Sequence, residues 1–222
     1  MWPAHWIALS SDPKDDLGVF LFRLDRELKS VPKKLEVRVS ADQRYKLYVN
    51  GHMVVFGPQR GDSHHWPYET VNIAPWLNKG ANRIVALVWS FGRVAPMAQH
   101  TVQTGFLFDC PDDVEWSTPR HWEVSRVIGW SFDRAMGHAG PHYIDVGPGE
   151  IVDGLLVPDS YVLGEGNFNW RRPHVIYGGE DRGNAGGGTP WFLIPRSIPL
   201  MNYELSTRVP DVRRKHQNDT TP

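Results

Sequence analysis

Residues 44–51 read RYKLYVNG, and this short stretch decides the fold class. Apolar and polar side chains alternate from Arg44 to Val49, which is the pattern of a β-strand with one buried face and one solvated face. Asn50-Gly51 then supplies the two positive φ angles of a type I′ turn, and residues 53–56, MVVF, form the returning strand. The stretch therefore predicts a β-hairpin.

Further strand patterns lie on both sides of this hairpin. Residues 34–41, KLEVRVSA, alternate strictly, whereas residues 83–89, RIVALVW, are apolar at both parities, as in a central strand covered on both faces. Shorter strands are predicted at 105–108 and 122–124. One helical turn is expected at 75–78, and no segment has the pattern of an amphipathic helix of three turns. The sequence thus predicts an all-β protein.

Composition narrows the classes of function. Of the 222 residues, 41% are hydrophobic and 22% are charged, which is typical of a globular protein. Lys and Arg number 24 against 25 for Asp and Glu. This balance argues against nucleic acid as the main partner, because phosphate binding needs a basic face. No apolar run approaches the roughly 18 residues of a membrane span.

The cysteine count and the first residues set two further bounds. Cys110 is the only cysteine, which excludes an intramolecular disulfide and a thiolate zinc cluster. The opening residues, MWPAHWIALSSDPKDD, show no basic region followed by a sustained apolar stretch, so no secretory signal is visible. A cytoplasmic protein is therefore expected if Met1 is the native start, and otherwise the location stays open.

The second half of the chain carries weaker strand patterns and more loops. Gly137–Pro141 and Gly178–Gly188 have the composition of loops. Residues 150–153 and 191–195 are predicted as edge strands, with Pro195 marking the end of the second.

Four segments together resemble the N-terminal β-sandwich of bacterial α-L-rhamnosidases. They are a strand ending in Val-Asn-Gly, a Gly-Pro-x-Arg turn, a Trp-x-Tyr segment, and a Leu-x-x-Gly-x-Asn sequence before a long strand, at residues 40–51, 57–62, 65–73 and 77–84. The first and last of these segments also occur in the sugar-binding sandwiches of many other glycosidases. The Gly-Pro-x-Arg turn and the Trp-x-Tyr segment are the two that narrow the resemblance to the rhamnosidases. It implies an all-β, galactose-binding-like jelly-roll β-sandwich with a loop-rich second half.

The resemblance also implies a domain organisation. The β-sandwich is expected over residues 1–210, with the dense motif match at 35–108 and a weaker extension at 111–210. Residues 211–222 have almost nothing apolar to bury, so a loose tail or a linker to a catalytic domain is expected there.

Enzymes of the resembled family carry their acid and base on an (α/α)6 barrel that follows the sandwich. These 222 residues hold no helical pattern of that length. The resemblance therefore implies a non-catalytic ancillary domain of a glycoside hydrolase, which packs against that barrel and helps to bind rhamnose-containing glycosides. Two other functions stay open: a free-standing carbohydrate-binding module, and a self-sufficient enzyme of unfamiliar type.

One loop has the composition of a sugar-binding site. An exposed aromatic ring can cover the apolar C–H face of a sugar while polar side chains bond its hydroxyl groups. The candidate ligand-binding residues are Arg60, Asp62, His64, Trp66 and Tyr68. In the alternative interpretation, Trp66 and Tyr68 close the open edge of the sandwich and Arg60 pairs with Asp62. The core is expected to hold Trp76, Trp89 and Trp122.

No catalytic residue and no metal ligand is predicted. Glu150 and Asp153 are close in sequence, but residues i and i+3 of a strand point to opposite faces and could not flank one glycosidic bond. Four side chains that could suggest a metal are Asp62, His64, His65 and Glu69. Adjacent histidines on an extended chain diverge, which argues against a transition metal. Calcium is the one cofactor that the resemblance implies, at no located site.

Overall fold

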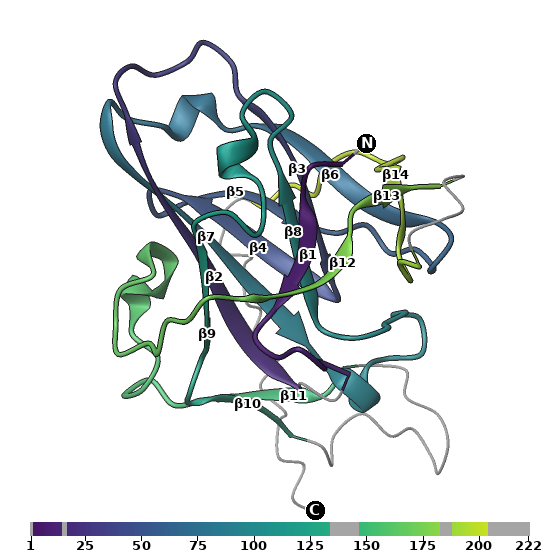
Figure 1. The fold of residues 1–222 in the computed structure, drawn as a ribbon. Helices are drawn as coiled ribbons and strands as arrows, with labels where there is room; N and C mark the ends of the chain where they lie inside the picture. The colour runs from purple at the N-terminus through teal and green to yellow at the C-terminus, as the bar shows by residue number, and fades with distance from the viewer. Residues whose placement is uncertain (1, 15–16, 134–146, 183–187, 204–222) are drawn as a thin grey trace, which may run out of the picture.

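The computed structural model describes residues 2–14, 17–133, 147–182 and 188–203. In these ranges the chain forms strands and short 3₁₀-helices and no α-helix, which confirms the all-β prediction (Figure 1). The same ranges contain no helix that is long and apolar enough to cross a membrane. The loop predicted at Gly137–Pro141 and the tail predicted at 211–222 lie outside the described residues.

Two sheets make up the body of the fold. The larger has seven strands, in the order β12 (His174–Gly178), β1 (His5–Ala8), β8 (Gly105–Asp109), β3 (Glu36–Asp42), β6 (Trp66–Asn72), β14 (Phe192–Pro195) and β13 (Glu180–Asp181). The smaller has five, in the order β5 (His52–Gly57), β4 (Arg44–Val49), β7 (Gly80–Ser90), β2 (Gly18–Leu28) and β9 (Trp122–Arg126). A separate ribbon pairs β10 (Trp130–Asp133) with β11 (Gly149–Val152).

The order of the strands along the chain is that of a jelly roll. The strands β3, β6 and β8 belong to the larger sheet, while β4, β5, β7 and β9 belong to the smaller one, so the chain crosses between the sheets repeatedly. Short 3₁₀-helices lie in the connections: η1 (Ala74–Trp76), η2 (Gly92–Val94), η3 (Val114–Trp116) and η4 (Asp159–Leu163). The fold is a jelly-roll β-sandwich, as the resemblance implied.

The central strand β7 is buried on both faces, as its sequence predicted. The core between the two sheets receives Ile84, Ala86 and Val88. The alternate side chains enter a second apolar cluster on the outer face of the smaller sheet, and they are Val85, Leu87 and Trp89. Side chains from residues 157–170 cover this second cluster. The smaller sheet is therefore covered on both faces.

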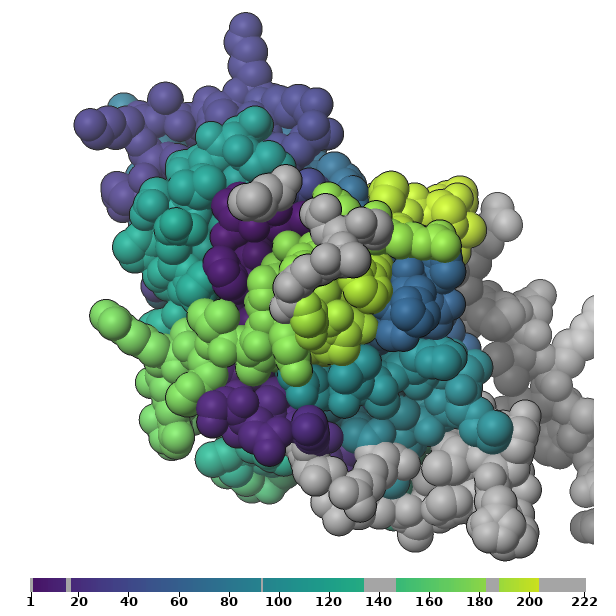
Figure 2. Space-filling view, turned by 45° about the vertical axis from the view of Figure 1, so that its right-hand side comes forward, coloured from purple at the N-terminus to yellow at the C-terminus, as the bar shows by residue number. Residues whose placement is uncertain are grey.

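The outer face of the larger sheet is covered by a cluster of tryptophans. Trp6 stacks on Trp191 with ring centroids 4.3 Å apart, and Trp66 meets Trp191 edge-on at 6.3 Å. Figure 2 shows the yellow and green C-terminal segments lying against the purple N-terminal segment, in agreement with the pairing of β1 and β12. The loop-rich second half thus contributes to both outer layers.

Several local predictions can be compared with this arrangement. Trp89 and Trp122 are buried as expected, whereas Trp76 is half-buried at the rim of the core. The strand at residues 191–195 was predicted as an edge, and this is wrong, because β14 lies between β6 and β13 and runs parallel to both. Pairing between such distant segments leaves no trace in the local pattern. Pro195 does end the strand.

The Asn-Gly turn is fixed by two asparagine side chains. Asn50 and Gly51 adopt the expected positive φ angles, 50° and 81°. Asn50 Nδ2 donates to Asn82 Oδ1 at 2.9 Å. The buried Asn82 side chain also bonds the backbone of Asn78, in both directions, and the carbonyl of Gly80. Val-Asn-Gly and Leu-x-x-Gly-x-Asn are therefore two parts of one hydrogen-bond network.

We expect Asn82→Ala to lower the free energy of unfolding by about 2–4 kcal/mol, because the buried groups that it bonds lose their partner. Urea denaturation followed by circular dichroism measures this loss. Asn78→Ala is the matched control: Asn78 is exposed and contributes only backbone atoms to the network, so its loss should stay within about 0.5 kcal/mol. Equal losses in the two variants would contradict the assignment.

A buried carboxyl group joins the larger sheet to two later segments. Asp42, at the end of β3, accepts hydrogen bonds from Thr101 Oγ1 at 2.7 Å, Val102 N at 2.7 Å and Trp191 Nε1 at 3.1 Å. Burial raises the pKa of Asp42 from 3.8 to about 6, against the opposing effect of these hydrogen bonds. Asp42 is thus a pH-sensitive link between β3 and the segments that cover it.

The raised pKa of Asp42 predicts a pH-dependent stability. Because the folded protein binds this proton more tightly than the unfolded chain, the stabilisation is complete below pH 3.8 and is lost as the pH rises through about 6. Between these values, the free energy of unfolding should decline more steeply in the wild type than in Asp42→Asn. Urea titrations at a series of pH values measure both slopes. Parallel profiles would show that Asp42 does not titrate in this range.

Candidate functional site: an arginine-lined pocket

The loop between β5 and β6 separates the expected ligand-binding residues instead of gathering them. Trp66 is only 2% exposed, inside the tryptophan cluster on the outer face of the larger sheet, so its ring has no surface to offer a sugar. Tyr68 is half-buried and packs edge-on against Trp2, with ring centroids 4.9 Å apart. Both aromatic residues therefore occupy structural positions.

Asp62 and His64 shape the turn that leads into β6. Asp62 Oδ1 accepts from the backbone N–H groups of His64 and His65, at 2.8 and 2.9 Å. The hydrogen bond with the His65 ring is the main reason that the pKa of Asp62 is lowered. His64 is exposed and stacks on Phe192, with centroids 5.8 Å apart. Asp62 thus acts as a turn-forming residue here.

Arg60 lies apart from the other four candidates, in a pocket of about 420 Å³. Arg44 begins β4, and residues 58–60 follow β5 directly. The rest of the lining comes from the chain after β14. The complete lining is Arg44, Pro58, Gln59, Arg60, Arg196, Ile198 and Met201. We refer to these residues as the arginine pocket.

The frame of the arginine pocket is built on the buried carboxylate of Glu69. Tyr45 Oη donates to Glu69 Oε2 at 2.7 Å, and Glu69 Oε1 accepts from Arg196 Nη1 at 2.8 Å and from Gln59 N at 2.9 Å. Burial raises the pKa of Glu69, while its hydrogen bonds to Tyr45, Arg196 and Gln59 act in the opposite direction. Gly57 is required nearby, because a Cβ at this position would collide with the Glu69 carboxylate.

Arg196 is fully engaged in this frame. Its Nη1 bonds Glu69, its Nε donates to the carbonyl of Ile198 at 2.9 Å, and its Nη2 donates to the carbonyl of Pro199 at 2.9 Å. Gln59 also joins the two sides of the pocket, because its Oε1 accepts from Ser197 N at 2.9 Å. The segment after β14 is thereby held against the loop after β5.

The other two arginines keep free donors. Arg44 Nη1 donates to the carbonyl of Pro58 at 2.7 Å, and its guanidinium lies 5.0 Å from the ring centroid of Phe56. Burial, and then repulsion by Arg60, lower the pKa of Arg44. Arg60 is exposed and forms no hydrogen bond or ion pair with any residue that the structure describes, so it does not pair with Asp62. Among the residues that the structure describes, no carboxylate lines the pocket.

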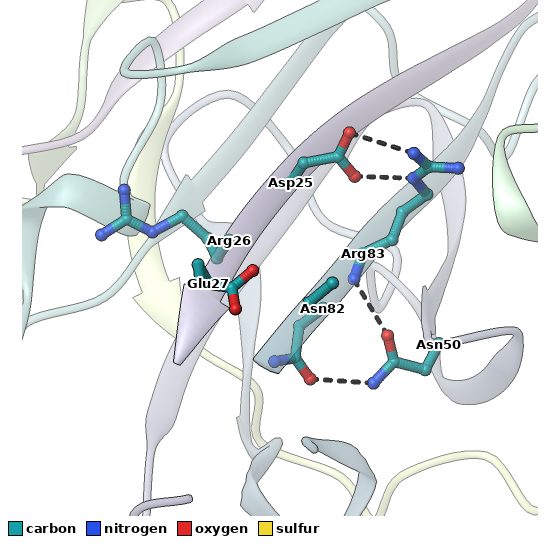
Figure 3. A pocket seen from close by; sticks show the side chains of 7 residues that line it. Asp25, Arg26, Glu27, Asn50, Asn82 and Arg83 are labelled. Atoms are coloured by element: carbon teal, nitrogen blue, oxygen red, sulfur yellow. Dashed lines mark hydrogen bonds and ion pairs between the residues drawn. The ribbon is translucent and has the colours of Figure 1, made fainter. Parts of the chain in front are cut away.

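A second pocket, of about 470 Å³, serves the scaffold. Its lining is Asp25, Arg26, Glu27, Asn50, Ala81, Asn82 and Arg83. Figure 3 shows Asp25 facing Arg83, at 2.6 Å from Nε and 3.1 Å from Nη2, while Arg26 points to the other side of β2. Asn50 Oδ1 accepts from Arg83 N at 2.9 Å. These groups satisfy one another, so this pocket offers a ligand fewer free donors than the arginine pocket does.

The remaining acidic and nucleophilic candidates occupy structural positions. Glu150 accepts from Trp130 Nε1 at 3.0 Å, and Asp153 accepts from Leu155 N at 2.9 Å. Cys110 is buried, and burial raises the pKa of its thiol to about 11. Among the described residues, no three His, Cys, Asp or Glu side chains converge as metal ligands would. Calcium at an unlocated site stays a prediction.

Sequence reasoning found one residue of the arginine pocket and missed its partners. The Gly-Pro-x-Arg turn pointed to Arg60. Arg44 looked like one of the solvent-facing polar residues of an alternating strand, and Arg196 lay in a Pro-rich segment. Nothing in their spacing shows that they meet. The buried Glu69 is the one available signal, since a carboxylate on the inner face of a strand needs a cationic partner.

The Glu69–Arg196 pair makes a prediction about stability. Arg196→Ala should lower the free energy of unfolding by about 3–5 kcal/mol, because it leaves a buried carboxylate unpaired. Arg60→Ala is the matched control and should change it by less than about 0.5 kcal/mol, since Arg60 is exposed and unpaired. Urea denaturation at neutral pH measures both. A stable Arg196→Ala variant would show that the pair does not hold the pocket together.

The chain was compared with known proteins. No family model matches it, and no curated protein is similar to it in sequence. Among solved structures, it is similar to the GH78 family rhamnosidase of Bacillus sp. GL1, with 25% identity and a TM-score of 0.70. This likeness covers 90% of this chain and 20% of that one.

Two further structures show the same fold. They are the α-L-rhamnosidase from Dictyoglumus thermophilum, with 16% identity, a TM-score of 0.60 and coverage of 89% of this chain and 22% of that one, and the α-L-rhamnosidase from Aspergillus terreus, with 16% identity, a TM-score of 0.54 and coverage of 78% and 21%. The chain spans about a fifth of the length of these enzymes. It therefore resembles a β-sandwich domain of the GH78 α-L-rhamnosidases, as the sequence predicted.

Proposed function

We propose that this chain is a non-catalytic ancillary domain of an α-L-rhamnosidase-like glycoside hydrolase, which packs against the catalytic (α/α)6 barrel of the same enzyme. The observation that carries the proposal is the ratio of the two coverages: 90% of this chain matches 20% of a GH78 family rhamnosidase. A unit of that size leaves most of such an enzyme to other domains. The chain accordingly contributes a scaffold, and a different domain cleaves the glycosidic bond.

The positions of the carboxylates support a non-catalytic role. A glycosidase needs two carboxyl groups on either side of one bond, with the acid held protonated. Glu150 and Asp153 make local hydrogen bonds beside turns. Asp25 and Glu27 line one pocket, but both oxygens of Asp25 are bonded to Arg83, as in a structural ion pair. Neither pair has the arrangement that the reaction requires.

An exposed apolar surface supports packing against another domain. The β10–β11 ribbon and the residues after it lie at the lower end of the molecule in Figure 1. Leu155 is 96% exposed and Ile128 is 67% exposed, where a monomeric surface more often has polar groups. The large apolar residues that are exposed on the ribbon and in the turns on either side of it, which together we call the ribbon surface, are Ile128, Ile151, Val152, Leu155 and Leu156. We take this surface as the face that meets the barrel.

Two measurements on the purified chain test this proposal. The chain should show no turnover of an aryl α-L-rhamnoside, because neither pair of carboxyl groups considered above, within the described residues, has the arrangement that the reaction requires. In sedimentation velocity it should self-associate through the uncovered ribbon surface. The double variant Ile151→Glu/Leu155→Glu should reduce this association, because it puts charges on the apolar face.

Met97→Glu is the control for the second measurement. Met97 is also an exposed apolar residue, at 63%, but it lies outside the ribbon surface, so its replacement should leave the association unchanged. Turnover that purifies together with the chain would refute the non-catalytic role. A chain that stays monomeric and does not bind a hydrophobic dye would refute packing through this surface.

The second candidate function is a free-standing carbohydrate-binding module. The open arginine pocket favours it, because a pure packing domain has no need of unpaired cations on its surface. This function predicts that the chain alone releases heat on titration with a saccharide. A domain that only packs would release none.

A further inference from the structure

We propose that the arginine pocket binds the carboxylate of an acidic saccharide, that is, of a sugar that carries a uronic acid group. The choice of a saccharide rests on the proposed function, whereas the choice of a carboxylate rests on the pocket itself. Two guanidinium groups, those of Arg44 and Arg60, line a cavity of about 420 Å³ in whose lining the described residues include no acidic side chain.

The charge around the pocket is unbalanced. Three arginines line it, and the one carboxylate beneath them, Glu69, is already bonded to Arg196, Tyr45 and Gln59. Among the described residues, the only hydrogen-bond partner of the Arg44 side chain is the carbonyl of Pro58. Arg60 has no hydrogen-bond or ion-pair partner there. This local excess contrasts with the formal net charge of the whole chain, which is −1. An anionic group would supply the missing countercharge.

The two arginines suit a carboxylate in geometry as well as in charge. A guanidinium presents its N–H groups as a planar fork, which matches the two oxygens of a carboxylate. Arg44 is held in place by Pro58 and by the face of Phe56, so it loses little freedom on binding. Its partial burial also strengthens its attraction to an anion relative to a fully solvated cation. Arg44 is therefore the preorganised cation of the pocket, and the exposed Arg60 supplies the second guanidinium group.

Apolar groups beside the cations fit the body of a sugar. Ile198 and Met201 line the pocket, and both are exposed. Next to Arg44 along β4, Lys46 lies 4.8 Å from the ring centroid of Tyr203, a ring that is 62% exposed. Exposed apolar and aromatic groups can cover the C–H face of a pyranose while the cations bind its acid group. A small inorganic anion would leave these surfaces unused.

Isothermal titration calorimetry with the 222-residue chain tests this inference. The probes are methyl β-D-glucuronide, methyl β-D-glucoside, which lacks the carboxylate, and acetate, which lacks the sugar. We expect the glucuronide to bind at least about tenfold more tightly than either of the others. Its affinity should fall as sodium chloride is raised, because salt screens the exposed Arg60.

Variants locate the site. Arg60→Ala should weaken glucuronide binding by about tenfold or more, and Arg60→Lys, which keeps the charge but not the fork, should retain part of the affinity. Arg172→Ala is the matched control: Arg172 is exposed, is likewise without a partner among the described residues, and lies in a different pocket. Its replacement should leave the affinity unchanged. Because Arg60 is exposed, its variants should fold as the wild type does.

Each contrary result refutes a named part. Equal affinity for glucoside and glucuronide would refute the carboxylate, and equal affinity for acetate would refute the saccharide. Equal effects of Arg60→Ala and Arg172→Ala, or no binding of the glucuronide, would refute the pocket as the site. These outcomes are independent of the proposed function, which fails by turnover of an aryl rhamnoside or by lack of association through the ribbon surface.

Discussion

The burial of β7 on both faces is the constraint on which the rest of the structure depends. Residues 84–89 of this strand are apolar without interruption, and such a run cannot lie in a two-layer sandwich with one wet face. Its outer side chains, Val85, Leu87 and Trp89, need a cover, and residues 157–170 supply it. The long irregular segments of the second half are therefore part of the core of this protein, although they contain little regular structure.

A second buried group, Glu69, connects the fold to the candidate site. A carboxylate inside the sandwich is stable only when it is paired and hydrogen-bonded, and its partners here are Tyr45, Gln59 and Arg196. Two of those partners lie at the open end of the β4–β5 hairpin, and the third lies after β14, more than a hundred positions away. By holding them together, Glu69 also brings Arg44 and Arg60 to one surface, where no acidic side chain of the described part of the chain balances them. The need of the buried Glu69 carboxylate for hydrogen-bond partners thus also assembles a positively charged pocket on the surface.

The same molecule presents two different surfaces. The β10–β11 ribbon surface is apolar, which suits contact with another domain, and the arginine pocket is cationic, which suits an anionic ligand. An ancillary domain of a glycoside hydrolase can use both at once, since the first would fix its place in the enzyme and the second would bind part of a glycan. Neither surface requires the chain to carry out catalysis itself.

The sequence by itself determined the strands of the central hairpin and those with a clear apolar pattern, because side-chain alternation and turn residues act locally. Residues 83–89 are apolar at odd and even positions alike, which predicted a strand buried on both faces, and Asn50-Gly51 predicted the hairpin turn. Only the tertiary structure decided which side chains share a surface. It buried Trp66 against Trp191 and placed Arg196 beside Arg44 and Arg60. Contacts between residues more than a hundred positions apart depend on how the layers close and leave no periodic signal.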